Sequence, residues 1–412
     1  MSEVVSTRTL TALLLSAVGL AAWAVGVQTF EGVASAGVGL TAAGALLSLK
    51  KGDAARLAKE WWPVGAFVGW SLLAPTLAGH PPSGSGLART LDWLALPFAV
   101  VSWQQTSPQL RAVAGKLAAA AMLSSCAVAG LQHYGIWPAE AAFAPFRWTQ
   151  LPFQRVYELV PGTTDRFMGG GMAFHRLKFA HVTSLGVIAA IAIAARSKPG
   201  SKGSWFTVAA VAGIAVWTFP YARMAAVAMT AAAGVTLVRA SSAPRRAALV
   251  AICFAAAGTS IAWFTPAMHD RFASSFTAQG SGDRLELLET GWRAVQEHPL
   301  TGVGPGQFRP AKFADATTPT MVTDNAGKSH LQILSMAAET GVPGALLFIL
   351  MLVWIALRGA GSALTLGALT FFALLSLAHD PLFQAQFSVA LVGILAAGVA
   401  DSKALRPEPS PR

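Results

Sequence analysis

Residues 204–265 read SWFTVAAVAGIAVWTFPYARMAAVAMTAAAGVTLVRASSAPRRAALVAICFAAAGTSIAWFT. This stretch consists of three apolar runs, near 204–220, 222–240 and 247–265, joined by short connections. Each run has close to the roughly 20 residues that a helix needs to cross the hydrocarbon core of a bilayer. The stretch therefore predicts three consecutive transmembrane helices.

The rest of the chain repeats this pattern. Of the 412 residues 54% are hydrophobic and only 12% are charged, about half the charged share of a soluble domain. This composition excludes a soluble enzyme, a disordered regulator and a nucleic-acid module. We expect an all-α integral membrane protein with about twelve transmembrane helices. The further apolar runs lie near 9–30, 32–49, 61–78, 91–105, 112–131, 177–195, 343–358, 362–378 and 384–400.

The basic residues of the short loops fall almost entirely on one side of the membrane when the N-terminus is placed in the cytoplasm. The opposite short loops hold Arg89 alone. This bias is the usual determinant of orientation, so the net charge of +11 reflects topology, and both termini are predicted to be cytoplasmic. The cytoplasmic set is Lys50, Lys51, Arg56, Lys59, Arg111, Arg196, Lys198, Lys202, Arg239, Arg245, Arg246, Arg358, Lys403, Arg406 and Arg412.

Two long segments remain on the outer face. We expect residues 1–265 to carry spans 1–9 with an outer segment near 132–176, residues 266–342 to form a large helical outer loop, residues 343–400 to carry spans 10–12, and residues 401–412 to form a cytoplasmic tail. Long translocated loops are exempt from the orientation rule, so their cations indicate an anionic ligand at the outer membrane face. These are Arg147, Arg155, Arg166, Arg176, Lys178, Arg271, Arg284, Arg293, Arg309, Lys312 and Lys328.

Within the second outer segment, GSGDRLELLETGWRAVQE predicts an amphipathic helix. Asp283 followed by Glu286 resembles a capping box, which would place Arg284 in the first helical turn. Free N–H groups there favour anions, and a guanidinium adds bidentate phosphate binding. The alternative is a surface arginine. The predicted apolar stripe is Leu285, Leu288, Trp292 and Val295.

The stretch KSHLQILSMAAETGVPG precedes the tenth apolar run. Ser329 with Gln332 fits a second capping box and would place His330 in the first turn of a helix. Gly341 is expected to end that helix and Pro343 to open the following span. A histidine at this boundary is suited to proton transfer; a satisfied structural histidine is the alternative.

Arg223 lies in FPYARMAAVAM, at the outer start of the eighth run. An ionisable residue at this depth indicates function, and the alternative is a side chain that extends to the interface.

The outer acids show no Asp-x-Asp pairing, so we expect no metal and no cofactor. These acids include Glu140, Glu158, Asp165, Asp270, Asp315 and Asp324.

At these residues the chain resembles the O-antigen ligase family, bacterial membrane glycosyltransferases that join lipopolysaccharide O-antigen to lipid A–core. His330, Gly341 and Gly344 match the family's histidine motif, although Leu331 departs from its usual polar residue. Arg284 in GSGDRLEL and the span-start Arg223 look like the family's two essential arginines. The stretch GMAFHRLKFAHVTSLG is similar to a less strict family motif, which matches at His175 and Phe179.

The resemblance implies a GT-C-like fold in the bacterial inner membrane with the active site facing the periplasm. It implies transfer of glycan from undecaprenyl-diphosphate to a sugar hydroxyl of lipid A–core, with inversion and without metal. Arg223 and Arg284 would bind the diphosphate, and His330 would be the general base. Membrane lipids are expected as partners, and nucleic acid is not. Further candidate substrate-binding residues are Arg166, His175, His181, Gln307 and Lys328.

O-antigen polymerases and protein O-oligosaccharyltransferases share this architecture and donor. The oligosaccharyltransferases usually carry a larger outer domain after the last spans, and polymerases generally lack the histidine motif, so a ligase is favoured. A lipid or polysaccharide transporter is an alternative from another class. It would predict internal repeats and ionisable residues at the membrane midplane, and neither is evident in the sequence.

Overall fold

The computed structural model describes residues 7–136, 158–173, 175–274, 278–314 and 328–404. In this part of the chain the structure is helical, apart from turns and an isolated β-bridge between Leu159 and Phe167. The helices are α1 (Thr7–Gly26), α2 (Glu31–Ser48), α3 (Asp53–Glu60), α4 (Trp62–Leu77), α5 (Gly84–Gln105), α6 (Pro108–His133), α9 (Arg176–Arg196), α10 (Pro199–Thr218), α11 (Arg223–Ala240), α12 (Pro244–Phe264), α13 (Pro266–Ser274), α14 (Ala278–Glu297), α16 (Gln332–Arg358), α17 (Ala363–Ser376) and α18 (Ala385–Ala404).

Every predicted apolar run coincides with one of these helices. Seven of the described helices are long and apolar enough to cross a membrane: α1, α6, α9, α11, α12, α16 and α18. The other runs form helices that are shorter, such as α4 and α17, or more polar, such as α5 with Arg89 and Asp92. The chain is therefore a helical membrane protein, while the count of twelve spans and the domain boundaries stay predictions.

The centre of the bundle is formed by α9 and α18, which are the most buried of the seven spans. Small residues allow this close packing; a Cβ at Gly393 of α18 would lie 2.3 Å from the indole of Trp23. At the other extreme, only 17% of the apolar window of α12 is buried. The core is thus built around α9 and α18, with α12 at the periphery.

Helix α16 (Gln332–Arg358) contains both the helix predicted to end at Gly341 and the tenth span that follows it. Gly341, with φ 73° and ψ 170°, divides the helix, and a Cβ at this position would lie 2.2 Å from Leu300 O. Only glycine adopts this conformation without strain. The predicted stop at Gly341 and restart at Pro343 are therefore confirmed.

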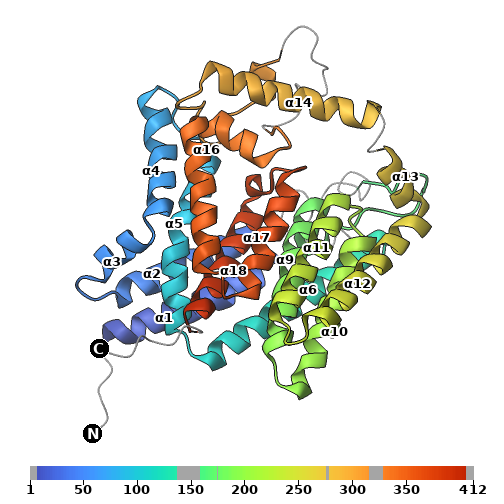
Figure 1. The fold of residues 1–412 in the computed structure, drawn as a ribbon, viewed down its shortest axis with the longest axis horizontal. Helices are drawn as coiled ribbons and strands as arrows, with labels where there is room; N and C mark the ends of the chain where they lie inside the picture. Colours follow the sequence, from blue (N-terminus) through green and yellow to red (C-terminus); the bar gives the residue numbers. More distant parts are fainter. Residues whose placement is uncertain (1–6, 137–157, 174, 275–277, 315–327, 405–412) are drawn as a thin grey trace.

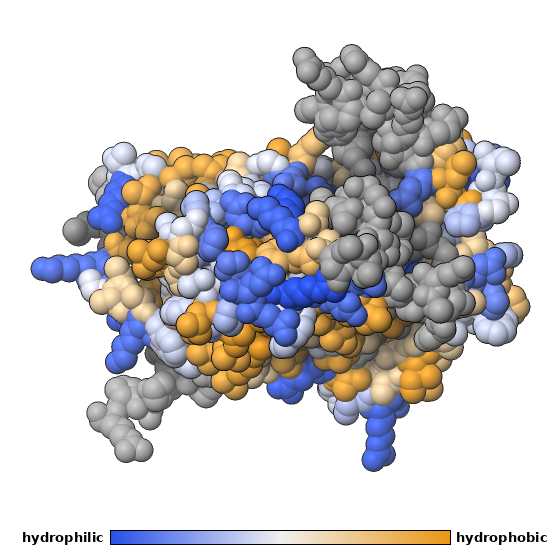
Figure 2. All heavy atoms as spheres, turned by 90° about the horizontal axis from the view of Figure 1, so that it is seen from above, coloured by the Kyte–Doolittle hydropathy of each residue, from blue (hydrophilic) through white to orange (hydrophobic). Residues whose placement is uncertain are grey.

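One end of the bundle is covered by α14, which crosses above the first part of α16 (Figure 1). Seen from above, a group of hydrophilic residues lies in the middle of the molecule with hydrophobic residues around it, and further hydrophilic residues project at the margins (Figure 2). The cations Arg147 and Arg155 and the acids Glu140, Asp315 and Asp324 lie outside the described residues. The second outer segment therefore supplies a helical cover over a polar centre.

Two sequence predictions for α14 are wrong. The helix begins at Ala278, so Asp283 is not its N-cap and Arg284 lies about two turns into it. Leu285 and Trp292 are exposed, whereas the buried face contains Leu287, Thr290, Gly291, Ala294 and Val295. The small residues of that face let α16 approach closely: a Cβ at Gly291 would lie 3.0 Å from the Leu334 side chain.

Candidate functional site

His330 lies in a tight turn immediately before α16. Its φ of 59° is uncommon for a residue other than glycine and often marks a functional site. The predicted capping box is wrong, because Ser329 Oγ contacts Ser335 Oγ at 2.8 Å and Gln332 Oε1 accepts a hydrogen bond from the Leu382 N–H. These side chains are used in tertiary contacts instead of capping the helix.

Asp380, which sequence reasoning did not identify, holds this turn. It is 4% exposed, and its Oδ2 accepts the His330 backbone N–H at 2.7 Å. Burial raises the pKa of Asp380 to about 6, against the lowering effect of hydrogen bonds from Ser335 and from the His330 N–H. The connection between α17 and α18 is thereby tied to the start of α16.

Three imidazole rings lie in a row inward from this turn. The ring centroids of His330 and His379 are 6.2 Å apart, and those of His379 and His181 are 5.6 Å apart. His181, a predicted site residue, is buried in α9 and contacts Gln384 Oε1 through Nδ1 at 3.0 Å. The structure therefore brings His181 and His330 into one cluster, with His379 between them.

Arg284 and Lys328 provide positive charge at this cluster. Burial, together with the charges of Arg284 and Lys328, lowers the pKa of His330 to about 4. Burial, the neighbouring imidazoles, and the charges of Arg284 and Arg176 hold the pKa of His379 well below its usual value. Arg284 of α14 therefore lies within electrostatic range of His330 in the turn before α16, and a pKa of about 4 leaves His330 uncharged at neutral pH.

A buried ion pair between α5 and α16 lies near the site. Arg89 Nη2 lies 2.5 Å from Glu339 Oε2, and the guanidinium lies 4.0 Å from the Phe383 ring centroid. The Glu339 side chain is fully buried. Arg89, the lone cation of the outer short loops, therefore joins α5 to α16 and to the turn that follows Asp380.

The other predicted residues are more scattered. Arg166 lies beside Asp165, at 2.9 Å, and over the Tyr134 ring. Gln307 donates to Pro81 O at 3.1 Å and so braces a loop. His175 precedes α9, within electrostatic reach of Lys328. Arg223 is the first residue of α11, as expected, and its role in the cluster stays a prediction.

Sequence reasoning missed His379, Asp380 and Gln384. A signal was available: His379 and Asp380 are adjacent ionisable residues between the last two apolar runs, on the predicted outer side.

Among the described residues, no group of three or more His, Cys, Asp or Glu side chains is placed to hold a metal ion. Metal independence stays a prediction.

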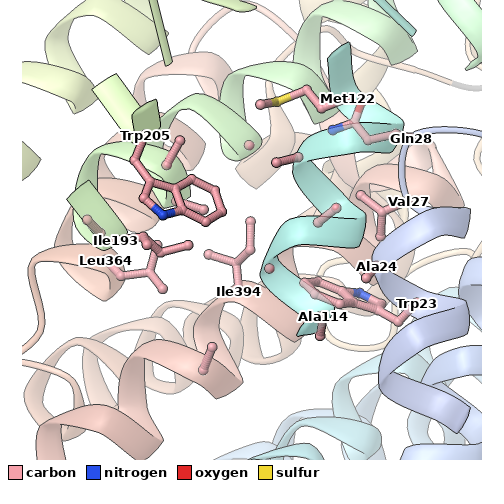
Figure 3. A pocket seen from close by; sticks show the side chains of 18 of the residues that line it. Trp23, Ala24, Val27, Gln28, Ala114, Met122, Ile193, Trp205, Leu364 and Ile394 are labelled. Carbon is pink, nitrogen blue, oxygen red and sulfur yellow. The ribbon is translucent and has the colours of Figure 1, made fainter. Parts of the chain in front are cut away.

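A groove of about 690 Å³ lies beside the cluster, between α14 and the first half of α16. Its walls combine apolar side chains with Glu289, Trp292, Arg293 and Gln296, and Leu331 connects it to His330. A separate cavity of about 130 Å³, mostly apolar, lies between α1, α6, α9, α10 and α18 (Figure 3). No predicted site residue lines that cavity. None lines the groove either, but the groove includes Leu331, the residue that follows His330 in sequence.

Residues 183–349 match the family model Wzy_C, described as O-Antigen ligase. The chain carries an O-antigen ligase family domain. This domain contains Arg223, Arg284 and His330, whereas His181, His379 and Asp380 lie outside the matched residues. A comparison with curated proteins finds no match. This match and the apolar helices indicate a membrane protein of ligase or polymerase type that acts in lipopolysaccharide biosynthesis.

Proposed function

We propose that the protein is an O-antigen ligase of the bacterial inner membrane, which transfers glycan from undecaprenyl-diphosphate to a sugar hydroxyl of lipid A–core. The proposal is supported by the placement of Arg284 within electrostatic range of His330, whose pKa is lowered by burial and by the charges of Arg284 and Lys328. This placement brings an anion-binding group near a neutral base, as this reaction requires. The proposed site faces the periplasm, and both chain termini are cytoplasmic.

In this proposal Arg284 binds the diphosphate of the donor. Arg223 is the second arginine that binds this diphosphate. A guanidinium forms paired, charge-assisted hydrogen bonds with phosphate oxygens. These bonds strengthen as negative charge develops on the leaving diphosphate, so the arginines stabilise the transition state more than the ground state. No metal or cofactor is invoked.

His330 is the general base. The acceptor hydroxyl oxygen attacks the anomeric carbon, the bond from that carbon to the diphosphate oxygen breaks, and the hydroxyl proton passes to His330. Undecaprenyl diphosphate leaves with the bonding electron pair, and the configuration inverts. The Nδ1 atom of His330 is buried and has no hydrogen-bond partner among the described residues.

A base with a pKa of about 4 is weak, and the donor itself can strengthen it. The same positive charges that lower the pKa of His330, those of Arg284 and Lys328, would be offset by the bound diphosphate. The pKa of His330 then rises toward neutrality only when donor is present. Base strength is in this way coupled to donor occupancy.

The groove between α14 and α16 is the proposed place for the acceptor. It is mostly apolar and carries polar groups at Glu289, Arg293 and Gln296 beside the exposed Trp292, a combination typical of ligand pockets. Leu331 lies at its edge. An acceptor sugar bound there would be near Leu331, the residue that follows His330 in sequence.

The experiment is in vitro transfer with purified protein, undecaprenyl-diphosphate glycan and three acceptors offered separately: lipid A–core, a second donor glycan and a peptide. We expect conjugates with lipid A–core alone, with inverted configuration and without added metal. Extension of the donor glycan would make the protein a polymerase, and peptide modification would make it an oligosaccharyltransferase. If no acceptor is modified while glycolipid crosses proteoliposome membranes, the protein is a transporter.

A further inference from the structure

A second groove, of about 700 Å³, lies between α9, α10, α11 and α12. Its walls are apolar, with Ile191, Phe206, Leu237 and Phe254 among them. Along α9 it extends from Val187 to Ala195, about 12 Å at 1.5 Å per residue. This length is close to one leaflet of the hydrocarbon core, about 15 Å. We call it the α9–α12 groove.

The polar end of the α9–α12 groove is basic. Lys202 of α10, Arg246 of α12 and the hydroxyls of Ser241 and Ser242 line it. This end faces away from the His330 cluster, because α9 begins beside that cluster at Arg176 and ends at Arg196. The basic end therefore belongs to the opposite leaflet.

In the part of the chain that the structure describes, no carboxylate forms an ion pair with these cations. Residues 166–269 contain neither Asp nor Glu, and no acidic residue lines the groove. Nearby ion pairs join Arg111 and Arg196 to Asp401; among the described residues, Lys202 and Arg246 form none. An apolar groove of this depth with an uncompensated basic rim is complementary to one kind of molecule, an anionic lipid.

Few residues of α12 pack against the other helices. The buried residues of α12 are Ala247, Gly258 and Ala262, and Val250 of the groove wall is exposed. This helix continues directly into α13 at Pro266, which leads toward α14. An acyl chain in the groove would give α12 apolar contacts on the side of α9–α11.

We infer that the α9–α12 groove binds an anionic phospholipid of the leaflet opposite the His330 cluster. One acyl chain fills the groove between α9 and α12. The phosphate lies between Lys202 and Arg246 and accepts hydrogen bonds from Ser241 or Ser242. The inference depends on the membrane location of the chain and not on the reaction at His330.

The test is a lipid titration of the delipidated full-length protein by native mass spectrometry. The probes are phosphatidylglycerol and phosphatidylcholine with identical acyl chains. Two cations at the headgroup predict that phosphatidylglycerol binds on the order of 30-fold more tightly. The Lys202→Gln/Arg246→Gln double variant should lose this preference. Ala210→Trp, at an exposed position of the groove wall, should weaken both lipids.

The matched control is Lys198→Gln/Arg245→Gln, which removes the same charge from exposed positions at the starts of the same helices, outside the groove. It should keep the preference. The inference is overturned if the control loses the preference equally, if Lys202→Gln/Arg246→Gln keeps it, or if Ala210→Trp binds lipid normally. Displacement of phosphatidylglycerol by equimolar undecaprenyl phosphate would also overturn it, because the donor's lipid would then be the preferred occupant.

Discussion

The backbone N–H of His330 donates a hydrogen bond of 2.7 Å to Asp380 Oδ2, across 50 residues of sequence. This bond fixes the left-handed turn that presents the imidazole. Because the N–H is only part-buried while the Asp380 side chain is buried, the carboxylate has few alternative partners. Asp380 is therefore a positioning residue for the base and not a group that contacts substrate.

Replacement of Asp380 should affect turnover more than substrate binding. Asp380→Ala leaves the His330 N–H without its partner, a loss of about 1–3 kcal/mol, so we expect kcat to fall about tenfold to 100-fold with KM for the donor little changed. Asp380→Asn retains an oxygen that can accept the N–H and should recover most of kcat. Steady-state kinetics measures this; an Asn variant as poor as the Ala variant would contradict the positioning role.

The pH dependence should reveal the coupling of His330 to bound donor. At subsaturating donor, kcat/KM reports the free enzyme, in which the pKa of His330 is about 4, so activity should fall only below that pH as the imidazole becomes protonated. At saturating donor, kcat should fall at a higher pH, because the diphosphate offsets Arg284 and Lys328. Identical acidic limbs in the two profiles would refute the coupling.

Lys328 provides an independent check of this electrostatic effect. Lys328→Gln removes a charge that lowers the pKa of His330, so the acidic limb of kcat/KM should move upward from about 4. Lys312→Gln removes the same charge from an exposed position outside the cluster and should leave the profile in place. Equal shifts in both variants would point to a general charge effect.

Gly341→Ala should strain the division of α16. The new Cβ would lie 2.2 Å from Leu300 O, at a φ of 73°, so we expect a loss of at least 1–3 kcal/mol in stability and a lower Tm in detergent. Gly39→Ala is the control, because a Cβ there meets no atom within 4 Å and alanine favours the helix by about 1 kcal/mol. A Gly341→Ala variant as stable as the wild type would contradict the left-handed backbone at this division.

The buried pair of Arg89 and Glu339 should behave as a unit. Arg89→Met alone leaves the fully buried Glu339 side chain without its cation, a loss of about 3–5 kcal/mol. The Arg89→Met/Glu339→Leu double variant removes both charges and should recover much of this stability. A double-mutant cycle on thermal stability tests the pair; strictly additive losses would mean that the two charges are not coupled.

Much of the architecture is predictable because a membrane imposes long apolar runs. Each of these runs became a helix, and Gly341 with Pro343 marked the division of α16 because both act through the local backbone. The two capping boxes failed because Ser329 and Gln332 form tertiary contacts instead, and α14 begins upstream of Asp283. Side-chain caps compete with such contacts, which local sequence does not reveal.

The candidate site was predictable to a similar extent. The motif predicted His330 and Arg284, and Arg284 lies within electrostatic range of His330 in the structure, while their catalytic roles stay predictions. His379 and Asp380 were missed because their partners, His330 and His181, are distant in sequence and become neighbours only when α9, α16 and α17 pack. The pairing of Arg89 with Glu339 spans 250 residues and follows from no local pattern.

A comparison of two variants separates the proposed base from the arginine proposed to bind the diphosphate. Donor binding and ligation would be measured for His330→Ala and Arg284→Ala, with His269→Ala as the control because His269 lies on α13 against Trp263. We predict that His330→Ala binds donor normally but fails to transfer glycan, that Arg284→Ala loses donor affinity at least tenfold, and that His269→Ala does both normally. Full ligation by a folded His330→Ala variant would contradict the assignment of His330 as the general base.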